Sequence, residues 1–321
     1  MRSTLAVTLL ACVSLLSCNP ALAQSGSKRP IRVLVGSPPG GPSDTQARLV
    51  VPRMSEILGA SIIVDNRPSN NGVVANEIAA RATPDGYTLI VGNSGTHAVN
   101  QTLYKSLPYD CIRDFAPITQ FSTTGLVVAA NPKLPASGIQ ELSAYAKKEP
   151  GKINIGIPGA TGQLAGDALW SALGIKMNNV NYKGSSPSEI ALLSGEVDIV
   201  MLTPLAAMNH LSTGKLKALG MTSSERHPAL PNIPTVAEQG VTGYDFQFWN
   251  GIFAPARTPP ALVRKYNQAV VAALNSPEVS ERLAQLGLVK SGNSPEAFAA
   301  IVKTDVERYR KVIIESGIPR M

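Results

Sequence analysis

Short runs of β-branched and other apolar residues alternate with longer helical patterns along this 321-residue chain. A short apolar run between turn residues is typical of a buried strand, whereas apolar residues that recur with helical spacing are typical of a helix. Strands that alternate with helices predict βαβ units, in which parallel strands form sheets covered by helices on both faces. The predicted strands are 31–35, 62–64, 88–91, 126–130, 154–157, 180–182, 199–202 and 218–221.

Capping residues mark where several helices should begin and end. Ser186 and Pro187 match an N-cap and a first-turn proline, Glu189 completes a capping box, and Gly195 stands where a C-terminal glycine belongs. Residues 235–240 repeat the pattern of threonine, glutamate and glycine, so they predict another short helix. Three C-terminal helices are predicted to begin at Thr258-Pro259, Ser276-Pro277 and Ser294-Pro295, the last ending near Gly317.

One predicted helix contains a proline. The pattern from 44 to 58 predicts a helix, and Pro52 falls inside it. Because proline lacks an N–H and clashes with the preceding turn, we expect a bend there, to which we assign no function.

The length and charge of the chain narrow its class. A chain of 321 residues suits two domains of roughly 150 residues each. The net charge is +7, but Lys and Arg form no basic stripe interleaved with aromatics, so nucleic-acid binding is not expected. Outside the first residues no apolar run approaches the roughly 20 residues needed to cross a bilayer, which excludes a polytopic membrane protein.

Residues 1–23 match a secretory signal peptide. Arg2 precedes an apolar stretch over 5–16, and the small-residue triplet 21–23 provides a cleavage site before Gln24. A soluble periplasmic product is the favoured interpretation. The alternative is a lipoprotein, because the residues leading into Cys18 resemble a bacterial lipobox, in which Cys18 would carry the lipid anchor.

Cleavage would leave Cys111 as the sole cysteine, so an intramolecular disulfide is not expected. A catalytic thiol would need a histidine partner, but His97, His210 and His227 are scattered without a local signature. We therefore interpret Cys111 as a structural residue.

Three loops rich in glycine or hydroxyl groups follow predicted strands, at residues 37–44, 93–96 and 156–162. In open α/β sheets ligands bind at the carboxyl ends of strands, where glycines let the backbone approach and helix N-termini favour an anion. None of these loops contains Lys or Arg, so an anion would be held by backbone dipoles. A tight turn capped by Ser43 or Asp44 is the alternative for the first loop.

The sequence lacks the enzyme motifs that such loops often carry. It has no GxSxG, Walker A, HExxH or paired CxxC pattern, and the glycines of 156–162 do not have GxGxxG spacing. We therefore predict no cofactor, no metal and no enzymatic activity. Asp44, Asp167 and Asp198 could act as acid or base, but no sequence feature pairs them.

Short motifs also occur in a characteristic order along the chain after residue 23. They are Pro39-Gly40-Gly41, Asp65-Asn66-Arg67-Pro68, Pro84-Asp85-Gly86-Tyr87, Leu107-Pro108-Tyr109-Asp110, Tyr182-Lys183-Gly184, Gly214 to Ala218 and Trp249 to Pro255. Together they resemble the substrate-binding proteins of tripartite tricarboxylate transporters, also called Bug proteins. The order and number of the motifs make the resemblance specific.

The resemblance implies two doubly wound α/β domains with a ligand cleft between them, the Venus flytrap architecture of type II periplasmic binding proteins. Crossing strands would join the domains near Thr123 and Thr124 and again near Gly243. Residues 24–123 and 243–321 would form domain 1, and residues 124–242 domain 2. Such a protein would be a monomeric periplasmic receptor that captures a small carboxylate and delivers it to a membrane permease of the tripartite tricarboxylate type. The ligand-binding residues implied are Ser37, Gly40, Gly41, Asp44, Ser94, Thr96, Gly159, Ala160, Thr161, Gly162, Tyr182 and Asp198.

Two alternatives stay open: a ligand-sensing partner of a periplasmic kinase domain, and an α/β hydrolase or lyase. The sequence also departs from the family pattern. Gln163 and Asn179 stand where the family commonly has histidines, and Cys111 replaces a usual proline. Residues 69–71 intervene before Gly72, but asparagine tolerates positive φ, so the turn can survive.

Overall fold

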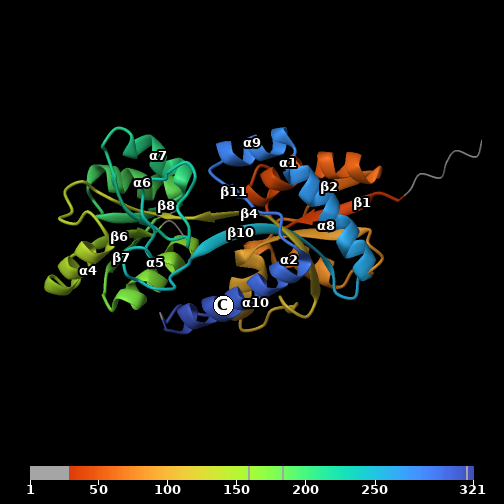
Figure 1. Cartoon of the computed structure of the whole chain (residues 1–321). Coiled ribbons are helices and arrows are strands. Elements are labelled where there is room, and N and C mark those ends of the chain that lie inside the picture. The colour runs from red at the N-terminus through yellow and green to blue at the C-terminus, as the bar shows by residue number, and fades with distance from the viewer. Residues whose placement is uncertain (1–28, 158–159, 183, 316) are drawn as a thin grey trace, which may run out of the picture.

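The computed structural model describes residues 29–157, 160–182, 184–315 and 317–321. It contains two β-sheets with helices packed against their faces (Figure 1). The first sheet has the strand order β11-β4-β10-β3-β1-β2, and the second has the order β7-β6-β8-β5-β9. The predicted α/β class is therefore observed.

The first sheet mixes parallel and antiparallel strands. β1, β2 and β3 are parallel, as predicted, whereas β4, β10 and β11 run antiparallel to their neighbours. The apolar pattern alone does not predict the latter three, because polar residues and Pro117 interrupt it in β4, and β11 has two residues. The bounds are β1 Ile31–Val35, β2 Ile62–Asn66, β3 Thr88–Asn93, β4 Phe115–Gly125, β10 Gln247–Pro255 and β11 Val289–Lys290.

The second sheet is mixed in the same way. β6, β7 and β8 are parallel, but β5 is antiparallel to β8 and to β9. The prediction of parallel sheets is thus wrong where the chain passes between the sheets, because there no crossover helix joins neighbouring strands, and parallel pairing needs one. The bounds are β5 Val127–Ala130, β6 Asn154–Ile157, β7 Asn178–Asn181, β8 Ile199–Leu202 and β9 Lys217–Met221.

Two long strands connect the halves of the molecule. β4 and β10 pair from Gln247 opposite Gly125 to Pro255 opposite Phe115 (Figure 1). The chain leaves the first sheet at Gly125 and enters β5 at Val127. A Cβ at Gly125 would lie 2.9 Å from the backbone nitrogen of Ser223, so the absence of a side chain lets the two segments approach at this crossing.

Helices pack on both faces of each sheet. α1 (Pro42–Leu58), α8 (Pro260–Leu274) and α9 (Pro277–Gln285) share an apolar core with one face of the first sheet. α6 (Ser185–Ser194) and α7 (Pro204–Leu211) do the same on the second. A single larger core contacts the remaining face of both sheets. Its helices are α2 (Val73–Ala80), η2 (Gly95–Val99), α3 (Asn100–Leu103), α4 (Ile139–Lys148), α5 (Ala160–Leu173) and α10 (Pro295–Glu315).

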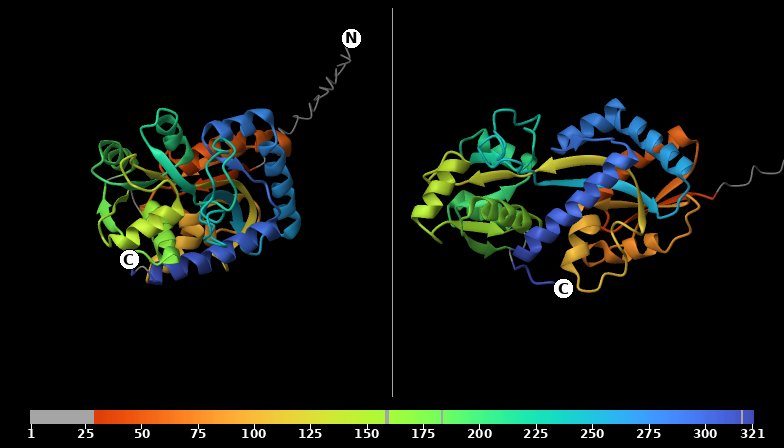
Figure 2. Two further views of the ribbon diagram at one scale, coloured as in Figure 1. Left: turned by 60° about the vertical axis from the view of Figure 1, so that its left-hand side comes forward. Right: turned by 60° about the horizontal axis from the view of Figure 1, so that its bottom comes forward.

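Helix α10 lies along the junction of the two halves, as Figure 2 shows. Its Tyr309 hydroxyl donates to the carbonyl oxygen of Gln247 at 3.0 Å, and its Asp305 carboxylate accepts from the indole N–H of Trp249 at 2.7 Å. Both partners belong to β10. The C-terminal helix is therefore tied to a strand that crosses between the sheets.

The predicted capping positions are close but not all correct. Helix α6 begins after Gly184, not at Ser186, although Gly195 adopts the left-handed conformation predicted for its end. Ser276 is the N-cap of α9 as predicted, whereas α8 begins one residue later than predicted, with Pro259 as its cap. Helix α1 continues through Pro52 to Leu58, and the bend there stays a prediction.

Residues 235–240 form a capping box without a helix. The Thr235 N–H donates to the Glu238 carboxylate at 2.6 Å, and the Glu238 N–H donates to the Thr235 hydroxyl oxygen at 3.0 Å. Gly240 then adopts a φ of +95°. The reciprocal bonds form as the pattern predicts, but too few residues separate them from the glycine for a helix to develop, so the segment is a turn.

Candidate functional site

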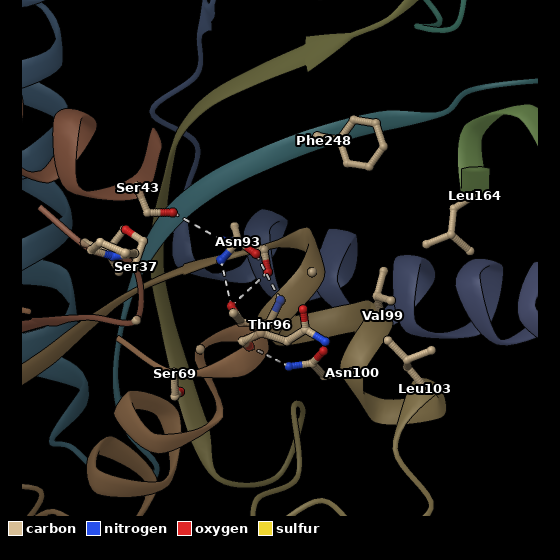
Figure 3. Close-up of a pocket in the computed structure, with 16 residues that line it drawn as sticks. Ser37, Ser43, Ser69, Asn93, Thr96, Val99, Asn100, Leu103, Leu164 and Phe248 are labelled. Carbon is tan, nitrogen blue, oxygen red and sulfur yellow. Dashed lines mark hydrogen bonds between the residues drawn. The ribbon is translucent and has the colours of Figure 1, made fainter. Parts of the chain in front are cut away.

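A cavity of about 320 Å³ lies at the carboxyl ends of the parallel strands β1, β2 and β3 (Figure 3). Such an edge is where open α/β sheets bind ligands. Backbone and side chains of three loops line it, together with Leu164 from α5 and Phe248 from β10. The lining residues are Gly36, Ser37, Pro38, Ser43, Ser69, Asn71, Gly72, Val91, Asn93, Gly95, Thr96, Val99, Asn100, Leu103, Leu164 and Phe248.

The loop after β1 contributes Ser37 to the cavity, but not Gly40, Gly41 or Asp44. The Ser37 hydroxyl oxygen is buried and has no hydrogen-bond partner among the residues that the structure describes. Its role in ligand binding stays a prediction. Gly40 adopts a φ of +81°, and the Gly41 N–H donates to the Pro38 carbonyl oxygen at 3.1 Å, so these glycines form the turn itself.

Asp44 shapes this loop and does not line the cavity. Its predicted role as a ligand-binding residue stays a prediction. Its buried carboxylate accepts from the Gly40 N–H at 2.8 Å, from the Asn66 side-chain amide at 2.8 Å and from the Arg48 guanidinium at 3.0 Å. Burial alone would raise the pKa of Asp44, but these hydrogen bonds and the charge of Arg48 outweigh it and lower the pKa. All strong partners of the carboxylate are thus supplied by the protein.

The loop after β3 is closed by its own hydrogen bonds. The Asn93 side-chain oxygen accepts from the Thr96 N–H at 2.9 Å, and the Thr96 hydroxyl oxygen accepts from the Asn93 N–H at 3.0 Å. The Asn93 amide also donates to the Ser43 hydroxyl oxygen at 3.1 Å, and Ser43 donates to Asn250 at 2.8 Å. Thr96 lines the cavity as predicted, whereas Ser94 is buried outside it.

His97 supports Thr96 from beneath the cavity. Its Nδ1 lies 2.9 Å from the Thr96 hydroxyl oxygen, and its ring stacks on Phe253 with centroids 4.0 Å apart. Burial lowers the pKa of His97 to about 3, so the imidazole is neutral at physiological pH. Cys111 lies nearby, with its thiol donating to the Thr96 carbonyl oxygen at 3.5 Å, and burial raises its pKa.

Sequence reasoning missed the contribution of the loop after β2. Ser69, Asn71 and Gly72 line the cavity, and the Asn71 carbonyl oxygen accepts from the side-chain amide of Asn100 at 3.0 Å. The asparagines and the glycine of this loop are a turn signal that the sequence does show, since both residue types tolerate positive φ. The structure confirms this turn, because Asn71 has a φ of 48° and Gly72 a φ of 68°. A Cβ at Gly72 would lie 2.9 Å from the Thr96 methyl carbon, so this turn touches the loop after β3.

The second sheet contributes fewer of the predicted residues. Gly159 lies outside the described residues, and Ala160 and Thr161 fall in the first turn of α5, where the described backbone leads to Leu164 in the cavity wall. Gly162 is buried in the same turn and does not line the cavity.

Tyr182 and Asp198 are not brought to the cavity. The Tyr182 hydroxyl donates to the Glu196 carboxylate at 2.7 Å, on the segment that precedes β8. Asp198 directly precedes β8, and its carboxylate accepts from the N–H of Asn154, the first residue of β6, at 2.8 Å. Because β6 and β8 are parallel, Asp198 lies at the amino ends of these strands, opposite the edge that the binding hypothesis requires.

Comparison with known proteins assigns the family. The sequence profile described as the tripartite tricarboxylate transporter family receptor matches residues 46–318. This chain belongs to that receptor family. The resemblance predicted from the sequence is thereby confirmed.

This receptor is similar in sequence to one curated relative and in sequence and structure to two solved proteins. It is 31% identical to BugT of Bordetella pertussis over 301 residues, or 93% of this chain and 92% of BugT. The solved structure of R. palustris Rpa4515 with adipate has 32% identity and a TM-score of 0.73, covering 92% of this chain and 99% of that chain. MatC from Rhodopseudomonas palustris with bound malate has 32% identity and a TM-score of 0.70, covering 89% and 99%. These matches confirm the two-domain periplasmic binding fold.

Gln163 and Asn179, at two positions where the resemblance led us to expect histidine, both hydrogen-bond to the Asp167 carboxylate. Burial raises the pKa of Asp167, whereas side-chain hydrogen bonds with Gln163 and Asn179 oppose that rise. Gln163 and Asp167 lie one turn apart in α5, and Asn179 lies in β7. The side chains of Gln163 and Asn179 are therefore the hydrogen-bond partners of this half-buried acid.

The described lining of the cavity carries neither positive nor negative side chains. None of the lining residues among 29–157, 160–182, 184–315 and 317–321 is a Lys, Arg, His, Asp or Glu. The same ranges contain no group of three or more His, Cys, Asp or Glu that could hold a metal ion. They also contain no helix long and apolar enough to cross a membrane. The cavity offers hydroxyl, amide and backbone groups to a ligand.

Proposed function

We propose that this protein is an exported, non-enzymatic receptor that binds a small carboxylate in the cavity beside β1, β2 and β3. It would deliver the carboxylate, as a monomer, to a membrane permease of the tripartite tricarboxylate type. Residues 1–23, which lie outside the described residues, would direct export. The observation that carries the proposal is a cavity lined by hydroxyl, amide and backbone groups in a chain whose relatives hold adipate and malate.

The proposed mechanism is closure of two domains around the ligand. We assign residues 24–123 and 243–321 to domain 1 and residues 124–242 to domain 2, which agrees with the strands found in each sheet. The cavity lies mainly on domain 1, and Leu164 of domain 2 completes its wall. A ligand that contacts both would favour the closed form by its differential affinity, with β4 and β10 as the connection that bends.

A carboxylate can be held here without a basic side chain. Hydroxyl groups, side-chain amides, backbone N–H groups and ordered waters can all donate to an anion. Ser37 offers a hydroxyl without a partner among the described residues, and the turns at Asn71 and Thr96 bring backbone and side-chain groups to the same space. The diffuse positive charge of the chain would assist encounter with an anion.

Two buried groups beside the cavity also support a binding role over catalysis. Nucleophilic chemistry by Cys111 would need a thiolate and a basic histidine. Burial raises the pKa of Cys111 and lowers that of His97 to about 3, so neither group is activated.

The test is a thermal-shift panel on protein that has been unfolded and refolded to remove ligand acquired during expression. Malate, adipate, citrate, benzoate and hexanoate form the panel, with uncharged hexanol as the control. At least one carboxylate should raise the melting temperature, and it should be recovered unchanged after long incubation. If no carboxylate raises the melting temperature, or if the bound acid is converted, the proposal is wrong.

A further inference from the structure

The cavity has one polar and one apolar side. Ser37, Ser43 and Asn93 lie together on one side, and Phe248 and Leu164 lie on the other (Figure 3). Val99 and Leu103 continue the apolar side along η2 and α3. Asn100 of α3 also lines the cavity beside Val99, but its side-chain amide donates to the Asn71 carbonyl oxygen and to the Tyr109 hydroxyl oxygen. The other polar lining groups come from the loops after β1, β2 and β3 and from the start of α1.

The apolar side is firmly packed. Val99, Leu103 and Leu164 belong to the main apolar core, with 6%, 8% and 3% of their surfaces exposed. Phe248 is half-buried, and its ring packs edge-on against the fully buried Phe246 with centroids 5.4 Å apart. A ligand that reaches this wall meets a surface of carbon atoms set by the core.

We propose that the ligand of this receptor carries a carboxylate at one end and an uncharged apolar segment, an alkyl chain or a phenyl ring, at the other. This inference rests on the proposed function and specifies its ligand class. The carboxylate lies against the loops after β1, β2 and β3, and the apolar segment lies against Leu164 and Phe248. A second carboxylate there would lose its water of hydration against a hydrocarbon surface.

The apolar segment also explains how binding would promote closure. Leu164 belongs to α5, which packs with the second sheet, whereas Val99 and Leu103 follow β3 of the first. An alkyl chain between them buries apolar surface on both halves at once. Because burial of apolar surface is favourable and non-directional, closure needs no charged partner on domain 2.

Hexanoate and adipate form a matched pair for the test, because they have the same carbon chain and differ in whether it ends in a methyl group or a second carboxylate. Calorimetric titration of the refolded, stripped protein should show hexanoate binding at least about tenfold more tightly than adipate, since one methylene in an apolar pocket alone can contribute roughly tenfold. Wild-type protein suffices for this comparison.

A variant locates the apolar segment. Leu164→Ala should weaken hexanoate binding about tenfold and leave propanoate binding unchanged, since the shorter chain does not reach α5. Ile190→Ala removes an equally large side chain that is 66% exposed on α6, and it should change neither affinity.

The outcomes separate this inference from the proposed function. If adipate, malate or citrate binds as tightly as hexanoate and benzoate, or more tightly, the inference is overturned while the proposed function stands. The same holds if Leu164→Ala weakens propanoate as much as hexanoate. If no member of the panel binds, both are overturned.

Discussion

The two halves of the molecule contribute unequally to the cavity. In the first, the loops after β1, β2 and β3 all reach it. Hydrogen bonds within the loop after β3 hold Asn93 and Thr96, and Asn100 of α3 donates to the Asn71 carbonyl oxygen. In the second, the described residues contribute Leu164, whereas Tyr182 bonds to Glu196 away from the cavity. One half thus presents a preformed polar surface, and the other covers it.

The largest effect is expected at the contact between two loops of the first half. Gly72→Ala places a Cβ 2.9 Å from the Thr96 methyl carbon at a φ of 68°. It should lower the free energy of unfolding by about 1–3 kcal/mol and weaken carboxylate binding more than about tenfold, because Thr96 must move. Denaturant unfolding and calorimetric titration measure the two effects.

A glycine in the second half serves as the control that distinguishes the effect of backbone strain on stability from the effect of a displaced Thr96 on binding. Gly174 has a φ of 63°, but no described atom lies within 4 Å of the position that a Cβ would take there. Gly174→Ala should therefore cost about 1 kcal/mol of stability and leave affinity unchanged. Equal losses of affinity in the two variants would contradict the unequal roles of the halves.

Two aspartates provide the next comparison. Asp44→Ala should lower the free energy of unfolding by about 2–4 kcal/mol near neutral pH, because it leaves the Gly40 N–H, the Asn66 amide and Arg48 without their carboxylate partner. Asp198→Ala removes the hydrogen bond from the Asn154 backbone N–H and should cost about 1 kcal/mol. Affinity should fall in the first variant and stay unchanged in the second, as measured by titration.

The pH dependence of stability checks the Asp44 assignment. Its pKa is lower in the folded protein than in the unfolded chain, so its contribution is present above the unfolded pKa of about 4 and is lost as the pH falls through the lowered value. The stability difference between wild-type protein and Asp44→Ala should shrink on strong acidification. A difference that grows on acidification would show that the carboxylate is not held in its ionised form.

A smaller effect is expected at Ser37. Ser37→Ala removes a buried hydroxyl oxygen that has no partner among the described residues, so stability should change by less than about 0.5 kcal/mol. Carboxylate affinity should fall roughly three- to tenfold, because the ligand loses one donor. Ser55→Ala is the control, since its hydroxyl donates to Ala60 away from the cavity. Unchanged affinity in Ser37→Ala would remove this residue from the site.

The smallest effect concerns pH and binding. His97 has its pKa lowered to about 3, and none of the described lining residues is ionisable. Affinity for a carboxylate should therefore change less than about twofold between about pH 6 and about pH 8. Titration at several pH values measures this, and a steep fall near pH 6.5 would indicate that a histidine takes part.

Local patterns predict the elements that depend on neighbouring residues. The apolar runs locate β1, β3, β6 and β8 to within two residues, and Gly195 ends its helix in the left-handed conformation because no side chain opposes it. The same reasoning fails for β4 and β10, whose polar residues are accommodated because these strands pair with each other between the halves. Thr235 and Glu238 show that a local pattern can be right about hydrogen bonds and wrong about the element. Their capping box forms as predicted, but the segment is a turn and not a helix.

The candidate site also has parts that local patterns predict and parts that they do not. The loops containing Ser37 and Thr96 are predictable because glycines and hydroxyls after a strand are visible in sequence. The sequence cannot show that Gly40, Asn66 and Arg48 hydrogen-bond to the oxygens of Asp44, so the position of this residue outside the cavity lining could not be predicted. Asp198 lies elsewhere because a residue before a strand is at the opposite sheet edge from one that follows it, and locating it requires the strand direction.

The sequence by itself determined the family, the α/β class and the strands whose loops form the polar side of the cavity, because these follow from motifs and short-range periodicity. Tertiary structure decided which of those loops meet, that β4 and β10 pair antiparallel within a mixed sheet, and that Leu164 and Phe248 face the polar groups. Contacts between residues far apart in the chain depend on strand order and packing. Local propensity does not encode them.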